Sequence, residues 1–239
     1  MKKLFLSIVT LVSLTVFAQE KTVINDAGAQ KRTLNSSFTG ITVSDGITLY
    51  LTQGTEELLA VSAADEKYLE RFKTEVEGGV LKIYFDSKGM NWSVNEKRKL
   101  TAYVSFKTLS KLHGAAGADV KLQGTIDVDD LDVKFTSGAA LNGKVKVNQL
   151  SVEQNSGSAI DVSGISSKFK INVSSGAVFK GFDLAVDFCD AKASSGGGVR
   201  VTINKELSAK ASSGGGVKYK GDGVIKDINV NSGGTVKRA

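Results

Sequence analysis

Hydrophobic and polar residues alternate over most of the chain after residue 113, and the alternation repeats in step with a Ser-Gly pair. The pairs are Ser137-Gly138, Ser156-Gly157, Ser175-Gly176, Ser195-Gly196, Ser213-Gly214 and Ser232-Gly233. Successive glycines of these pairs are 19, 19, 20, 18 and 19 residues apart. A repeat near 20 residues that contains a period-two pattern is typical of strands stacked in a solenoid. The pattern predicts an all-β fold, a parallel β-helix with coils of about 19 residues.

Three columns of apolar residues support this prediction. Residues three places after each glycine are Leu141, Ile160, Phe179, Val199, Val217 and Val236. Residues five places before it are Val133, Val152, Ile171, Ala191, Ala209 and Ile228. Residues seven places before the first five glycines are Leu131, Leu150, Phe169, Cys189 and Leu207. Mostly charged residues lie between them, so the columns are expected to point inward and to stack about 4.8 Å apart.

Each Ser-Gly pair is predicted to form a corner, because a tight change of direction needs a residue without Cβ. An earlier and weaker copy of the corner is predicted at His113-Gly114, 24 residues before Gly138. His113 then occupies the place that serine takes in later repeats. A structural role in this corner is favoured over a catalytic one, since His113 is the single histidine of the chain.

The first half of the chain has a less regular pattern. Alternating residues predict strands over 38–51, 58–63, 73–77, 80–85 and 100–106, a short helix over 65–72, and a long hairpin loop over 86–99. Residues 34–112 are expected to form an irregular N-terminal β cap of the same domain as the repeat coils, 113–239. Residues 19–33 are expected to be a linker. A cap is needed because exposed strand edges pair readily with other chains.

Residues 1–18 have the three parts of a secretory signal peptide. Two lysines precede an apolar run over 4–17, and small Ala18 stands before the expected cut. Such a run is too short to span a membrane, and charged residues or glycines interrupt every later one, so no transmembrane segment is predicted. The expected locations are the periplasm, the outer-membrane surface or the exterior.

Charge and cysteine content narrow the classes of partner. Without residues 1–18, which hold two of the 31 bases and no acid, the chain carries 29 bases and 25 acids, a formal charge of +4. The lysines are dispersed, which argues against a nucleic-acid partner. A single cysteine, Cys189, cannot form an internal disulfide, so packing alone must stabilise the fold. Because Cys189 lies in an inward column, it is predicted to be a packed, inert thiol.

The chain resembles a known family, the putative auto-transporter adhesin, head GIN domain family, from about residue 38 to 236. The motifs that carry the resemblance are Phe38-Thr39-Gly40-Ile41, Gly46-Ile47-Thr48-Leu49, Gly79-Val80-Leu81-Lys82-Ile83 and the serial Ser-Gly-Ala or Ser-Gly-Gly units. The resemblance implies an exported, β-helical, surface-associated protein with an adhesive role. It implies no catalytic residue. Many relatives look like lipoproteins, whereas this chain lacks the anchoring cysteine after the expected cut.

Candidate metal and catalytic groups are weak. The segment 114–122 loosely fits a calcium-binding nonapeptide, but that motif acts in tandem copies, so no metal or cofactor is predicted. Carboxylates occur at Asp127, Asp129 and Asp130, and again at Asp183, Asp187 and Asp190. They leave open a polysaccharide-cleaving enzyme. The outward positions also carry many lysines, which is the pattern of a solvated sheet, so a non-enzymatic protein is favoured.

The most binding-like element is Trp92, followed by Lys97 and Arg98. An exposed indole can stack on a sugar, although Trp92 could instead plug the first coil. The favoured interpretation is an exported, adhesin-like binding module whose partner is a glycan or a component of the cell envelope or matrix. The alternative is a structural solenoid that assembles into homo-oligomers through its open ends.

Overall fold

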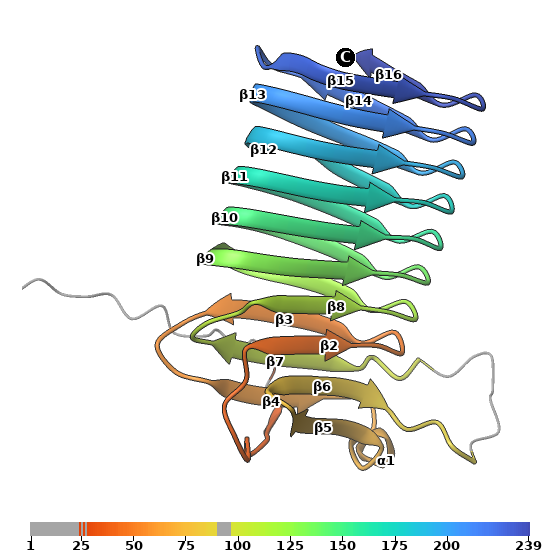
Figure 1. Ribbon diagram of the computed structural model, residues 1–239. Helices are drawn as coiled ribbons and strands as arrows, with labels where there is room; N and C mark the ends of the chain where they lie inside the picture. The colour runs from red at the N-terminus through yellow and green to blue at the C-terminus, as the bar shows by residue number, and fades with distance from the viewer. Residues whose placement is uncertain (1–23, 25, 27, 90–96) are drawn as a thin grey trace, which may run out of the picture.

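The chain folds into a parallel β-solenoid of about seven turns with a spacing near 19 residues (Figure 1), which confirms the predicted fold class. The computed structural model describes residues 24, 26, 28–89 and 97–239. The predicted signal peptide and Trp92 lie outside the described residues. Long strands stack in chain order and in parallel through the C-terminal half. They are β9 (Asp119–Phe135), β10 (Ala140–Gln154), β11 (Ala159–Val173), β12 (Val178–Ala193) and β13 (Gly198–Ala211).

Like residues stack on like because neighbouring strands pair with an offset equal to the repeat. Leu141 lies beside Ile160, and Val152 lies beside Ile171. The predicted inward columns are buried as far as Leu207, Ala209 and Val217. Ile228 is the last residue of the column that lies five places before each glycine. It is 43% exposed, because no further coil covers it. The core is therefore a continuous stack of aliphatic and aromatic side chains that ends abruptly at the C-terminal side.

Each long strand bends twice, so a coil has three sides. In β12 the buried positions run through Phe179 and Gly181, then Leu184 and Val186, then Cys189 and Ala191, and the alternation changes phase between these groups. A change of phase turns the chain around the core while the parallel pairing continues. The last side of each coil, called here the third side, comprises residues 130–135, 149–154, 168–173, 188–193, 206–211 and 224–230.

The corners form a stacked column along one edge of the solenoid (Figure 1). In all six Ser-Gly pairs both residues have positive φ, about 45–54° for serine and 70–72° for glycine. The glycine N–H of one corner donates to the carbonyl of the serine one coil further on, as in Gly138 to Ser156 at 3.0 Å and Gly157 to Ser175 at 3.1 Å. The backbone of the corners thus forms its own hydrogen-bond ladder.

The prediction of a corner at His113-Gly114 is wrong. The corner lies at Ala116-Gly117, where φ is 47° and 73°, and Gly117 donates to the carbonyl of Ser137 at 3.0 Å. Gly114 is a strand residue beneath the ring of Phe135, and a Cβ there would lie 2.4 Å from that ring. Glycine is needed at position 114 for close packing.

The first half continues the same solenoid in a different chain order. β2 (Gly40–Val43) lies between β6 (Val80–Phe85) and β8 (Lys111–Gly114), and all three are parallel. β3 (Thr48–Gln53) lies in the same way between β7 (Thr101–Phe106) and β9. β8 in turn pairs with the end of β9. The region expected to be an irregular cap is therefore built largely of regular coils whose strands come from distant parts of the sequence.

Antiparallel strands close the N-terminal end (Figure 1). β5 (Phe72–Glu77) pairs antiparallel with β6, and β4 (Leu58–Ser62) pairs antiparallel with β7. β1 (Gln30–Lys31), within the segment expected to be a linker, pairs with β4. The short helix α1 (Glu66–Leu69) lies beside them. These elements interrupt the parallel stacking that a further coil would need.

Helix α1 begins at an N-cap, Asp65, whose carboxylate accepts a hydrogen bond from the Lys67 backbone N–H at 3.0 Å. This cap is the local reason for the helix, which is shorter than the predicted 65–72. The segment 86–99 is not a hairpin loop, because β6 and β7 pair with different strands on different sides of the solenoid.

The C-terminal end is formed by β14 (Gly216–Lys220), β15 (Val224–Val230) and β16 (Thr235–Arg238). β14 and β15 stack on the first and last parts of β13, and β16 stacks on β14. Among the described residues, no helix is long and apolar enough to cross a membrane.

Candidate functional site

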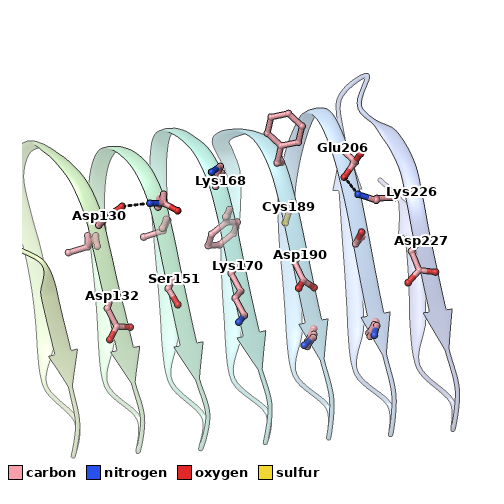
Figure 2. Close-up of a pocket in the computed structure, with 18 of the residues that line it drawn as sticks. Asp130, Asp132, Ser151, Lys168, Lys170, Cys189, Asp190, Glu206, Lys226 and Asp227 are labelled. Atoms are coloured by element: carbon pink, nitrogen blue, oxygen red, sulfur yellow. Dashed lines mark hydrogen bonds and ion pairs between the residues drawn. The ribbon is translucent and has the colours of Figure 1, made fainter.

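A long open groove of about 810 Å³ runs across the third side of the coils from β9 to β15 (Figure 2). Five acids and five lysines line it, with serines, a glutamine, two phenylalanines and other apolar residues among them. The acids are Asp130, Asp132, Asp190, Glu206 and Asp227, and the bases are Lys168, Lys170, Lys192, Lys210 and Lys226. The charges of the groove therefore balance, and its polar groups stand beside apolar side chains such as Leu150 and Phe188.

The parallel register positions these side chains. One outward column comprises Asp132, Ser151, Lys170, Asp190, Ser208 and Asp227. A second comprises Asp130, Gln149, Lys168, Phe188 and Glu206. Because each coil adds one residue to each column, the groove presents a new polar group about every 4.8 Å along the solenoid.

Contacts between neighbouring coils hold several lining groups in place. Lys226 Nζ lies 2.9 Å from a Glu206 carboxylate oxygen. The Gln149 amide donates to the Asp130 carboxylate at 2.9 Å. Exposed pairs of this kind contribute at most about 1 kcal/mol to stability, because water solvates both partners. They orient the side chains while leaving hydrogen-bonding capacity for a ligand.

Phe188 is the unusual member of the groove. It occupies an outward position between Lys168 and Glu206 and is 45% exposed. The Lys205 ammonium lies 5.5 Å from the ring centroid. An exposed ring among polar groups offers a flat apolar surface to a ligand. Sequence reasoning missed Phe188, although an aromatic residue in a column of Asp, Gln, Lys and Glu is a readable signal.

The carboxylates considered for polysaccharide cleavage are divided between two hollows. Asp190 lines the groove, whereas Asp187 lines a separate hollow on the middle side of the coils together with Asp127 and Asp129. Hydrogen bonds from Lys205 and then Asn204 lower the pKa of Asp187. A glycosidase general acid needs a raised pKa, so Asp187 is unsuited to that role.

Cys189 points into the core beneath the groove and is 5% exposed. Burial, and to a lesser extent the charge of Asp190, raises the pKa of the thiol far above its usual value. We expect iodoacetamide to alkylate the folded protein at least about a hundredfold more slowly than the unfolded chain, because reaction requires opening of the coil. Mass spectrometry over a time course, with and without denaturant, measures this ratio. Equal rates would contradict the inert role.

His113 lies in β8 between Thr42 of β2 and Lys134 of β9. Its Nε2 is 3.6 Å from an Asp132 carboxylate oxygen. Burial lowers the pKa of His113 despite this acid, which favours the neutral imidazole. Its place is within a strand, so the predicted role in a corner is not supported.

Lys97 and Arg98, two of the predicted binding residues, do not line the groove, and Trp92 lies outside the described residues. Arg98 packs its guanidinium 4.5 Å from the ring centroid of Phe85, and its carbonyl accepts a hydrogen bond from Ala64 at 2.8 Å. Lys97 is exposed. A binding role for Trp92, Lys97 and Arg98 stays a prediction.

Among the described residues, a void in the core and the grouped acids do not form a second kind of site. An apolar void among the core residues of β9 to β12 measures about 10 Å³, which is room for one water at most. In the described part of the chain, no three His, Cys, Asp or Glu side chains come together as metal ligands.

The fold and the groove define the chain as a β-solenoid with an open polar face and a filled core. It belongs to the family described as putative auto-transporter adhesin, head GIN domain, whose model matches residues 37–223. Comparison with curated proteins gave no match.

Solved structures share the fold. A putative adhesin from Bacteroides fragilis superposes with a TM-score of 0.79 at 16% identity, over 88% of this chain and 96% of that one. A putative adhesin from Parabacteroides distasonis gives a TM-score of 0.69 at 19% identity over the same shares. A putative lipid binding protein from Parabacteroides distasonis gives 0.66 at 19% identity, again over 88% and 96%.

Proposed function

We propose that this protein is an exported, non-enzymatic adhesin-like module that binds an extended glycan of the cell envelope or matrix along the third-side groove. The observation that carries the proposal is the run of outward polar groups, one per coil, with the exposed ring of Phe188 among them. Membership of a putative adhesin family supports the adhesive role. The signal peptide predicted over residues 1–18 supplies the route of export.

The chemistry of the groove favours a polyhydroxylated ligand over a highly charged polymer. Five acids and five lysines cancel, so the field that a polyanion needs is absent from this face. Carboxylates, amides, hydroxyls and ammonium groups together both accept and donate hydrogen bonds, as sugar hydroxyls require. Phe188 adds a surface on which the apolar face of a sugar ring can stack.

The groove also suits an adhesin because it is open and long. The void in the core of these coils measures only about 10 Å³, so a ligand is expected to bind on their outer surface. A rigid stack of coils presents its side chains at fixed spacing, which lowers the entropy lost on binding an extended chain. The acyl chain of a lipid would likewise have no room inside this core and would have to bind on the outside.

Glycan-array binding of the protein without residues 1–18 tests the proposal. We expect binding that Phe188→Ala weakens about tenfold, since one stacking contact of this kind contributes roughly 1–3 kcal/mol. Ile165→Ala is the matched control, because Ile165 is 51% exposed on a different side of the coils. It should bind as the wild type does.

Trp92→Ala separates the groove from the loop that the sequence singled out. Loss of binding in Trp92→Ala but not in Phe188→Ala would move the site away from the groove. Absence of glycan binding by the wild type would reject the proposal. Release of reducing ends from a bound polysaccharide would contradict the non-enzymatic role.

A further inference from the structure

The C-terminal end of the solenoid exposes what every other coil buries. In the described part of the chain, β15 is hydrogen-bonded along one edge only, to β13. Ile228 is 43% exposed and Val230 is 45% exposed, whereas Ala209 and Ala211, the residues beside them in β13, are fully buried. The last coil thus leaves open both a seven-residue strand edge and the apolar residues that would support another coil.

This end differs from the opposite one in how its edge is protected. Natural proteins guard edge strands with charges or irregular pairing. At the N-terminal end β5 is antiparallel to β6 and carries charges at Lys73, Glu75 and Glu77. At the C-terminal end the inward positions of β15 are Ile225, Ile228 and Val230. The charges of β15 itself are the outward pair Lys226 and Asp227, which have opposite sign, while Lys237 and Arg238 belong to β16 on another side of the coil. The edge of β15, with its apolar inner side, is a surface for strand addition.

The directions of the side chains in β15 are symmetric about the point between Lys226 and Asp227. A bulge at Lys226 places Ile225 opposite Leu207 and Asp227 opposite Ser208. Ile225 and Ile228 therefore face inward, while Lys226 and Asp227 both face outward. The order inward, outward, outward, inward reads the same in both directions along the strand.

We propose that two copies of this chain dimerise end to end through antiparallel pairing of β15 with β15, about a twofold axis between Lys226 and Asp227. In this register Lys226 lies opposite Asp227 of the second copy, twice, and Ile225 lies opposite Ile228 of the second copy, twice. Every pair keeps inward residues with inward residues. The cores of the two solenoids then continue across the junction.

The charges of Lys226 and Asp227 favour this register over the two registers that are shifted by one residue. A shift by one residue in one direction sets Asp227 opposite Asp227 of the second copy, and a shift in the other direction sets Lys226 opposite Lys226. Like charges directly opposite each other destabilise a strand pair. Each shift also sets an outward residue opposite an inward one, which exposes an isoleucine. The central register alone satisfies both conditions.

A head-to-tail arrangement is disfavoured. It would bring the parallel C-terminal edge against antiparallel, charged β5, and repetition would build an open filament. The twofold arrangement buries the same surface of both copies and closes at two subunits. The proposal does not rest on glycan binding, because the junction is the open edge of β15. Only Lys226 and Asp227, on the last coil, belong to both the groove and the junction.

Charge reversal tests the junction. Sedimentation equilibrium of the mature protein is expected to show a dimer at micromolar concentration. Lys226→Asp and Asp227→Lys should each weaken the dimer about tenfold or more, since each change turns two attractions into two repulsions. An equimolar mixture of the two variants should recover a wild-type dimer, because one variant then carries two acids at this site and the other two lysines.

Two controls separate the junction from general effects. Lys226→Asp also removes the ion pair with Glu206, so recovery in the mixture excludes loss of folding as the cause. Ile165→Lys changes an exposed apolar residue on another side and should leave the dimer unchanged. The proposal is overturned by a wild type that stays monomeric to about 100 μM, by growth into filaments, by single variants that dimerise normally, or by a mixture that does not recover.

Discussion

Gly164→Ala is expected to destabilise the protein by about 3 kcal/mol or more. Gly164 in β11 lies beside Val145 in β10. A Cβ built on Gly164 would stand 1.9 Å from the Val145 carbonyl oxygen, and φ at Gly164 is 117°. The contact is with backbone of the neighbouring coil, so no side chain can move aside. The two coils must separate or the bend must be rebuilt.

Urea unfolding followed by circular dichroism measures this loss, with Gly157→Ala as the matched control. Gly157 has a φ of 70° at a Ser-Gly corner, and its Cβ would meet no atom within 4 Å. The control should cost only about 1 kcal/mol, from the strain of a left-handed backbone. Equal losses in the two variants would show that positive φ, and not the close approach of coils, makes glycine necessary at position 164.

Phe179→Ala is expected to destabilise the protein by about 3–5 kcal/mol. The Phe179 ring is fully buried and packs against Phe169 at a centroid distance of 5.1 Å. Removal leaves a cavity in the centre of the stack. Because the neighbouring coils are fixed by their hydrogen-bond ladders, the walls of the cavity can collapse only slightly, and the cost should fall near the upper end of the range.

Phe188→Ala is the matched control for Phe179→Ala, since Phe188 lies in the same strand and faces outward. Its unfolding free energy should lie within about 0.5 kcal/mol of the wild type. A melt by differential scanning calorimetry distinguishes the two variants. A loss at Phe188 as large as that at Phe179 would mean that its ring contributes to the core.

The repeat coils could be predicted almost completely from the sequence. The columns through Leu150, Phe169 and Cys189 are buried as expected, because stacking gives each coil the same environment at the same position. The candidate site was less predictable. Charged residues between the inward columns were expected to face outward. The groove, however, needs the bends that align them, and the exposure of Phe188 follows from the phase of those bends.

The early corner shows why local patterns fail where coils are not successive. His113-Gly114 resembles a Ser-Gly pair in sequence, yet the turn lies at Ala116-Gly117. Phe135 decides where the corner lies, because its ring occupies the space above Gly114. It is 21 residues further along the chain and one coil away. A contact of this kind has no local signature.

The sequence by itself determined the solenoid, its period and its inward columns, because each coil repeats one local solution to burial and turning. The tertiary structure alone decided the interleaved order of β2, β3 and β6 to β8, the groove and the uncovered edge of β15. These features depend on which distant segments lie side by side. Loop closure and pairing between distant strands are set by the whole chain, whereas a stacked repeat is set by its nearest neighbours.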